Sequence, residues 1–147
     1  MVNLAEGKSA AVDDCCYYSN TLSRWVAGEI VQTGNIKKRV AVIRRYIEIA
    51  EECWKLHNFS SAASILFGVD NHAVKRLKQT WKGLPKRSVK VFSDLLETIT
   101  VANGFERFRE VILKAEPPLV PYLPIYLRDI TLLELGNSTY LEGNECF

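Results

Sequence analysis

The side chains best suited to chemistry in this chain are two histidines, four cysteines and several carboxylates. His57 and His72 lack the His-x-x-x-His spacing of a metal site, and neither has an obvious serine or cysteine nucleophile as a partner. We interpret each as a helix-end histidine whose ring is satisfied by hydrogen bonds. Glu51 and Glu52 are adjacent, so their side chains diverge by about 100° around a helix. The sequence therefore predicts no covalent catalysis, no metal site and no cofactor.

The basic residues are the next group that could bind a charged partner. They gather around Trp81, at Lys75, Arg76, Lys78, Lys82, Lys86, Arg87 and Lys90. Interleaved cations and aromatic rings can form a surface that binds nucleic acid. These cations, however, are spread around the predicted helices and do not line one side of them. The formal net charge of the chain is only +2. No glycine-rich phosphate-binding motif is present. We therefore expect neither nucleic-acid binding nor direct nucleotide binding.

The cysteines and the N-terminal residues indicate the compartment. Cys15, Cys16, Cys53 and Cys146 show no Cys-x-x-Cys spacing, and Cys53 lies beside an apolar helical stripe, where a reduced thiol acts as a small hydrophobe. The first residues are neither basic nor continuously apolar, so we expect no secretory signal and no membrane span. With 48% hydrophobic and 24% charged residues in 147, the composition is typical of one globular, cytoplasmic domain.

A long amphipathic helix must position any site in this chain. Apolar residues recur at alternating steps of four and three from residue 36 to residue 54, at Ile36, Val40, Ile43, Ile47, Ala50 and Trp54. The segment from Leu56 to Phe59 breaks the period. Ser60 and Ser61 can then cap a second, more apolar helix. The two helices are expected to meet at a polar Asn-Phe corner.

The remaining pattern is also helical. Residues 1–18 are predicted to be a loose leader, residues 19–143 the domain and residues 144–147 a tail. A first helix is expected to begin at a cap at Ser19 or Asn20, and a short one to run from a cap at Asp70 or Asn71 through Val74, Leu77 and Trp81 to Gly83. Two more are expected over Ser88–Ile99 and over Tyr126–Leu135. Another is expected to begin at Phe105, after a break at Asn103-Gly104. The prediction is an all-α orthogonal array of six or seven helices.

Several motifs occur along this array in a characteristic order: Ser19-Asn20-x-Leu22-Ser23-x-Trp25-Val26, Leu56-x-Asn58-Phe59-Ser60-Ser61, Arg76-Leu77-Lys78-x-Thr80-Trp81, Glu116-Pro117-Pro118-x-x-Pro121-Tyr122-Leu123, Tyr126-Leu127-x-Asp129-Ile130-Thr131 and Gly136-Asn137. Together they make the chain resemble the catalytic domain of Ras-family guanine nucleotide exchange factors, the CDC25-homology or RasGEF domain. The resemblance runs from about Asn20 to Glu142. It implies an exchange factor that releases GDP from a Ras-family small GTPase without covalent chemistry.

The resemblance also implies where the GTPase is held. In this family a bowl of core helices grips the switch II segment, and a helical hairpin pushes switch I aside. The positions carried over to the bowl are Arg45, Val91, Leu95, Tyr126, Asp129 and Thr131. Plain core packing is the alternative for Val91, Leu95 and Tyr126, and a pair with Glu48 or Glu52 is the alternative for Arg45. We assign structural roles to Asn58, which is expected to bond backbone groups at the corner, and to Phe59, Leu77 and Trp81.

The chain also departs from the family pattern at both ends. We expect a domain truncated at both ends, because the family has helices before the part matched by Asn20, and the hairpin would follow residues 144–147. Two functions therefore stay open. The chain is an exchange factor or a fragment of one; alternatively, it is a non-catalytic module that binds or scaffolds GTPases and lacks the hairpin that exchange needs.

Overall fold

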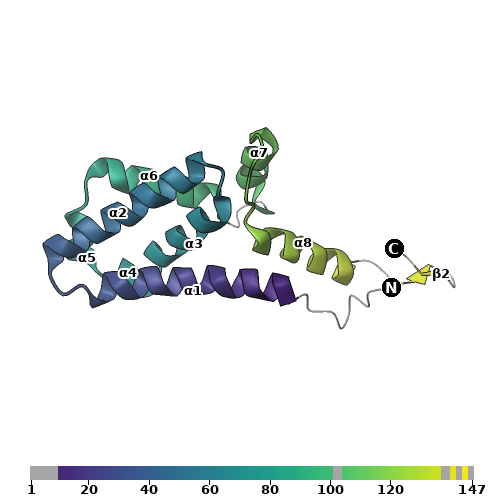
Figure 1. Ribbon diagram of the computed structural model, residues 1–147, viewed down its shortest axis with the longest axis horizontal. Coiled ribbons are helices and arrows are strands. Elements are labelled where there is room, and N and C mark those ends of the chain that lie inside the picture. Colours follow the sequence, from purple (N-terminus) through teal and green to yellow (C-terminus); the bar gives the residue numbers. More distant parts are fainter. Residues whose placement is uncertain (1–9, 101–103, 137–139, 142–143, 146–147) are drawn as a thin grey trace.

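The computed structural model describes residues 10–100, 104–136, 140–141 and 144–145. The elements are α1 (Ala10–Gln32), α2 (Ile36–Lys55), α3 (Phe59–Val69), α4 (His72–Lys75), α5 (Lys78–Lys82), α6 (Lys86–Thr98), α7 (Glu106–Lys114), α8 (Leu123–Gly136), β1 (Tyr140–Leu141) and β2 (Asn144–Glu145). Figure 1 shows α3 between α1 and α2, with α8 passing near the N-terminal end of α1. The all-α prediction is confirmed, and a two-residue antiparallel hairpin of β1 and β2 is the one addition among the described residues.

Helix α2 begins where the pattern predicts. The Asn35 side chain accepts a hydrogen bond from the backbone N–H of Lys38, at 3.1 Å, and so satisfies one of the free donors of the first turn. The predicted apolar stripe is buried in its middle, at Ile43, Ile47 and Ala50, whereas Ile36 is 50% exposed. Tyr46 was not part of the predicted stripe, yet it is buried together with Ile47. The buried face of α2 is therefore wider than the simple period indicates.

Helix α3 is the centre of the core. It packs against both α1 and α2, which is why eight of its eleven residues are buried. The predicted cap at Ser60 or Ser61 is wrong: the helix begins at Phe59, and Asn58 is its cap. The Asn58 side chain accepts from the Ser61 backbone N–H at 3.1 Å. An amide oxygen one residue before the helix reaches the free N–H groups of the first turn, which the serine hydroxyls inside the helix do not.

Close approach of α1 and α3 depends on a small residue. A Cβ atom on Gly68 would lie 2.7 Å from both the Ser23 carbonyl oxygen and the Val26 Cβ. The same interface holds a buried polar contact, in which the hydroxyls of Ser19 and Ser64 lie 2.5 Å apart. The Ser64 hydroxyl also reaches the Ser60 carbonyl oxygen at 2.8 Å. The backbones of α1 and α3 therefore approach each other closely around Gly68 and Ser64.

The corner between α2 and α3 is held by a distant segment. His57 adopts a left-handed backbone with φ of +57°, a conformation that glycine and asparagine adopt more readily. Its ring Nδ1 lies 2.9 Å from the Glu116 carbonyl oxygen, and its own carbonyl accepts from the Val120 N–H at 2.9 Å. The Ser60 N–H donates to the Val120 carbonyl at 3.3 Å. His57 is thus a structural, hydrogen-bonded histidine.

An aromatic cluster fills the core beneath this corner. The Phe59 side chain is fully buried, with ring centroids 5.0 Å from Trp54 and 5.6 Å from Phe108. Both contacts are edge-to-face, the arrangement that aromatic pairs favour. Because Phe108 belongs to α7, the cluster joins α2 and α3 to a helix nearly fifty residues further along the chain.

The predicted start of the first helix needs correction, and part of the expected tail is a strand. Helix α1 begins at Ala10, not at Ser19 or Asn20, so residues 10–18 of the expected leader are helical. Two alanines and an acidic Asp13 in the first turn favour a helix start there. Residues 1–9 lie outside the described residues, and Asn144–Glu145 of the expected tail form β2.

The short helix predicted through Val74, Leu77 and Trp81 is two helices, α4 and α5. The Val74 carbonyl accepts from the Trp81 indole N–H at 3.0 Å, whereas in an unbroken helix the N–H four residues on would be its partner. Leu77 is a half-buried residue with non-helical backbone angles between the two helices. The Trp81 ring packs on Phe92, with ring centroids 5.3 Å apart. Trp81 therefore links α4 and α5 to α6.

Later helices also start earlier than predicted. Helix α6 begins at Lys86, directly after Pro85, and α8 begins at Leu123. Pro124 therefore lies in the first turn of α8, where its missing N–H costs nothing. Gly104, at the predicted break before α7, has a φ of +67°, and Asn103 lies outside the described residues. None of the helices formed by the described residues is both long and apolar enough to cross a membrane.

Candidate functional site

An apolar groove opens on the surface where α1 and α2 meet beside α3. We call it the aromatic groove. It encloses about 570 Å³ and is lined by Leu22, Trp25, Glu29, Ala41, Val42, Arg45, Tyr46, Ile49 and Ile65. Two of its large apolar side chains stay in water, since Trp25 is 59% exposed and Ile49 is 40% exposed. Exposed aromatic and aliphatic side chains around a hollow are typical of a surface that binds another protein.

One wall of the aromatic groove consists of Trp25, Tyr46 and Glu29. The Trp25 and Tyr46 rings meet edge to face, with centroids 6.0 Å apart and an interplanar angle of 89°. The Tyr46 hydroxyl donates a hydrogen bond to Glu29 Oε2. Burial, together with the hydrogen bond to Glu29 and its negative charge, raises the pKa of Tyr46 above its ordinary value. The hydroxyl therefore stays protonated throughout the physiological pH range and can donate its hydrogen bond to Glu29.

Arg45 is the predicted site residue that the structure places in this groove. It lies on the exposed side of α2, where its Nη1 atom is 3.5 Å from Glu48 Oε2. Arg44 pairs with the same glutamate, at 3.6 Å from Oε1, but does not line the groove. The Arg45–Glu48 pair matches the alternative expected for Arg45, yet its side chain is 75% exposed. Because such exposed pairs are weak, Arg45 can still exchange this partner for another one.

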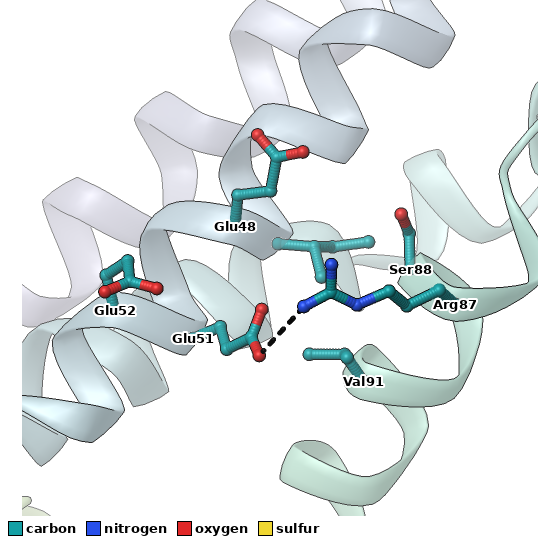
Figure 2. A pocket seen from close by; sticks show the side chains of 7 residues that line it. Glu48, Glu51, Glu52, Arg87, Ser88 and Val91 are labelled. Carbon is teal, nitrogen blue, oxygen red and sulfur yellow. Dashed lines mark ion pairs between the residues drawn. The ribbon is translucent and has the colours of Figure 1, made fainter.

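A second hollow lies on the other side of α2, between α2 and α6. It encloses about 300 Å³ and is lined by Ile47, Glu48, Glu51, Glu52, Arg87, Ser88 and Val91. Figure 2 shows Arg87 reaching across it toward Glu51, and the ion pair between them measures 3.7 Å. Lys55 also approaches Glu51, at 3.4 Å, and Glu52, at 2.7 Å. These carboxylates are therefore already paired with cations of the same chain.

The α6 and α8 residues of the predicted bowl do not gather in the aromatic groove. Val91 lines the hollow between α2 and α6, and Leu95 is half-buried against the core. Tyr126 and Thr131 are exposed on α8, where the Thr131 hydroxyl donates to the Leu127 carbonyl at 3.0 Å. Arg45 on α2 thus lies apart from these positions, which are on α6 and α8.

Asp129 is held by a partner within the chain. Arg109 Nη2 donates to both of its carboxylate oxygens, at 2.8 and 2.6 Å, and Arg109 Nε donates to the Gly104 carbonyl at 3.0 Å. The guanidinium of the neighbouring Arg128 lies 5.4 Å from the centroid of the Phe105 ring. Asp129 therefore fastens α8 to the start of α7.

Replacing Asp129 with asparagine should lower the free energy of unfolding by about 1 kcal/mol, since the pair it breaks is only partly exposed. Urea unfolding followed by circular dichroism measures this change. Replacing Glu97, which forms a more exposed pair with Arg107, with glutamine is the matched control and should cost less. An equal loss of unfolding free energy for the two variants would show that the Asp129 pair stabilises the domain no more than the exposed pair does.

Comparison with known proteins decides the family. The family model of the RasGEF domain matches residues 2–146. The chain belongs to the RasGEF domain family. The Ras guanine nucleotide exchange factor M of Dictyostelium discoideum is 40% identical over 127 residues, which are 86% of this chain and 14% of that protein. The Ras guanine nucleotide exchange factor C of the same organism is 34% identical over 139 residues, 95% of this chain and 10% of that protein.

A human relative extends the similarity to a Rap exchange factor. The Rap guanine nucleotide exchange factor 5 of Homo sapiens is 33% identical over 124 residues, which are 84% of this chain and 21% of that protein. The RasGEF chain therefore spans 10 to 21% of the length of these three relatives. Within its described residues, no group of three or more histidine, cysteine or acidic side chains is placed to hold a metal ion.

Three groove residues of this RasGEF domain were missed from the sequence. Trp25 was noted only as a member of the motif over residues 19–26, and neither Glu29 nor Tyr46 was singled out. The spacing of Trp25 and Glu29, four residues apart, places them on one face of α1. That spacing could have grouped Trp25 with Glu29 from the sequence. It could not have shown that the hydroxyl of Tyr46, on α2, contacts Glu29.

Proposed function

We propose that this RasGEF domain binds a Ras-like small GTPase through the aromatic groove and promotes the release of GDP. The observation that carries the proposal is the exposed Trp25 in an apolar hollow, with Arg45 at the edge, in a chain of the RasGEF family. Tryptophan and arginine are the side chains that most often dominate binding energy at protein interfaces. The groove offers both within one surface.

The proposed action is coupled binding without covalent chemistry. A factor that binds the nucleotide-free GTPase more tightly than the GDP form must, by reciprocity, weaken the affinity of the GTPase for GDP. Each tenfold of that weakening corresponds to about 1.4 kcal/mol of differential binding. An apolar groove with one exposed cation can supply such a difference if the switch II segment fits it only in the nucleotide-free form.

The other predicted contact positions remain part of the proposal. Val91 and Leu95 on α6 and Tyr126 and Thr131 on α8 would extend the contact beyond the groove, whereas Asp129 would act by holding α8 in place. A cytoplasmic location is also proposed. It is supported by the free thiols of the described cysteines, Cys15, Cys16 and Cys53, because thiols persist in reducing compartments.

Release of a fluorescent GDP analogue from a panel of Ras, Rap and Ral GTPases tests the proposal. Acceleration above the intrinsic rate supports exchange. A pull-down on the nucleotide-free forms identifies the alternative: binding without acceleration would make the chain a non-catalytic or scaffolding module, and the absence of both signals would refute the proposal.

Arg45→Glu provides the sharpest test of where the GTPase binds. We expect it to weaken GTPase binding about tenfold, as charge reversal inside an interface does. Arg44→Glu reverses a charge on the same helix that pairs with the same Glu48 but lies outside the groove. It should change binding less than threefold. Equal effects of the two variants would show that the groove is not the contact surface.

A further inference from the structure

We infer that Glu29 is a positioning residue of the aromatic groove: its carboxylate fixes the Tyr46 ring, and Tyr46 in turn holds Trp25 in the orientation that a bound GTPase meets. This inference rests on the proposed function and deepens it. It assigns a role to one of the two charged side chains, Glu29 and Arg45, that line this largely apolar hollow. It concerns how the groove is prepared before a partner arrives.

The three side chains, Trp25, Glu29 and Tyr46, contact one another in sequence and connect two helices. Trp25 and Glu29 are four residues apart on α1 and therefore share a face of that helix. Tyr46 comes from α2, donates a hydroxyl hydrogen bond to Glu29, and its ring meets the Trp25 ring edge to face. Among the residues that the structure describes, no lysine or arginine forms an ion pair with Glu29. Its one described side-chain partner is thus the tyrosine.

Burial makes the hydrogen bond a strong constraint on Tyr46. The tyrosine is only 7% exposed, so an unpaired hydroxyl there would lose its hydrogen bonds to water without compensation. Glu29 satisfies the hydroxyl and so selects one orientation of the ring. Trp25, by contrast, is 59% exposed and is fixed mainly by its neighbours. Removing the Glu29 acceptor therefore loosens first Tyr46 and then Trp25.

A preoriented Trp25 raises affinity because less side-chain freedom is lost on binding. Immobilising one such side chain costs enough to change an affinity about fivefold. We expect Glu29→Ala and Tyr46→Phe each to raise the half-saturating concentration of GTPase about fivefold, while the maximal rate of GDP release stays within twofold. Glu29→Gln keeps an oxygen acceptor and should stay within twofold of the unmodified chain.

The double variant separates positioning from direct contact with the GTPase. If Glu29 acts through Tyr46, the Glu29→Ala and Tyr46→Phe changes remove the same interaction, so their combined effect should equal either single effect. Additive losses, or a loss for Glu29→Ala with none for Tyr46→Phe, would overturn the inference. Tyr122→Phe is the matched control, since this half-buried tyrosine packs on Phe67 outside the groove. Its half-saturating concentration should not change.

A second readout needs no GTPase. The chain contains three tryptophans, so labelling with 5-fluorotryptophan gives a small set of fluorine signals in which Trp25→Phe identifies the Trp25 resonance. Glu29→Ala and Tyr46→Phe should shift or broaden that resonance and leave those of Trp54 and Trp81 in place. An unchanged Trp25 resonance would refute the positioning role. If no GTPase binds the unmodified chain, the proposed function fails, and the fluorine spectra still decide the role of Glu29.

Discussion

Replacing Trp25 with alanine should weaken binding of the nucleotide-free GTPase about 30-fold while hardly changing the stability of the domain. The side chain is 59% exposed, and its described ring contact is the edge-to-face one with Tyr46. Little packing is therefore lost when the indole is removed. In the complex the GTPase would cover this indole in the aromatic groove. Central aromatic anchors of interfaces cost about 2 kcal/mol or more when truncated, which corresponds to a factor of about 30.

Titration calorimetry with nucleotide-free GTPase measures this loss, and urea unfolding checks stability. Tyr17→Ala is the matched control, because Tyr17 is an aromatic residue of α1 that is 68% exposed and lies outside the groove. It should bind as the unmodified chain does. If Trp25→Ala bound equally well, the aromatic groove would not be the contact surface, whatever exchange activity the chain showed.

Replacing Phe59 with alanine should lower the free energy of unfolding by about 3 to 5 kcal/mol. The ring is fully buried and joins Trp54 of α2 to Phe108 of α7. Truncation therefore leaves a cavity among three helices and removes two edge-to-face contacts. A domain of this size is stable by only about 5 to 15 kcal/mol. This one change can remove most of that margin.

Urea unfolding followed by circular dichroism tests this prediction. Leu56→Ala serves as the control, since Leu56 lies at the same corner but is 75% exposed, and it should cost well under 1 kcal/mol. If Phe59→Ala does not fold, Phe59→Leu keeps most of the volume and should cost about 1 kcal/mol or slightly more. A loss for either Phe59 variant no larger than that for Leu56→Ala would contradict the role given to the aromatic cluster.

Local chemistry predicted much of the helical framework. The bounds of α2 follow from Asn35, which caps it, and from the regular apolar period that ends at Trp54. The start of α1 was predicted too late because Cys15, Tyr17 and Tyr18 face water and so add no apolar period, although Ala10 and Ala11 favour a helix. Where tertiary hydrogen bonds intervene, as at Trp81, local pattern could not show that one helix becomes two.

The site was harder to predict than the framework. A period places Trp25 on a helix face, but it does not distinguish a face that is buried from one that is left in water. Arg45 came from the family resemblance, and the structure puts it beside Trp25 and Tyr46. Asp129 came from the same source, yet the structure shows its carboxylate bound by Arg109. That partner is twenty residues away along the chain, beyond the reach of any helical spacing.

The segment that holds the α2–α3 corner also bears on synthesis of the protein. His57 and Ser60 take backbone partners from Val120, and the His57 ring contacts the Glu116 carbonyl. A ribosome makes the corner about sixty residues before it makes those partners, and chains emerge at about 5 to 20 residues per second. For several seconds the left-handed His57 has no support from its later partners. The bend between the two central helices can become fixed only after residue 120 has left the exit tunnel.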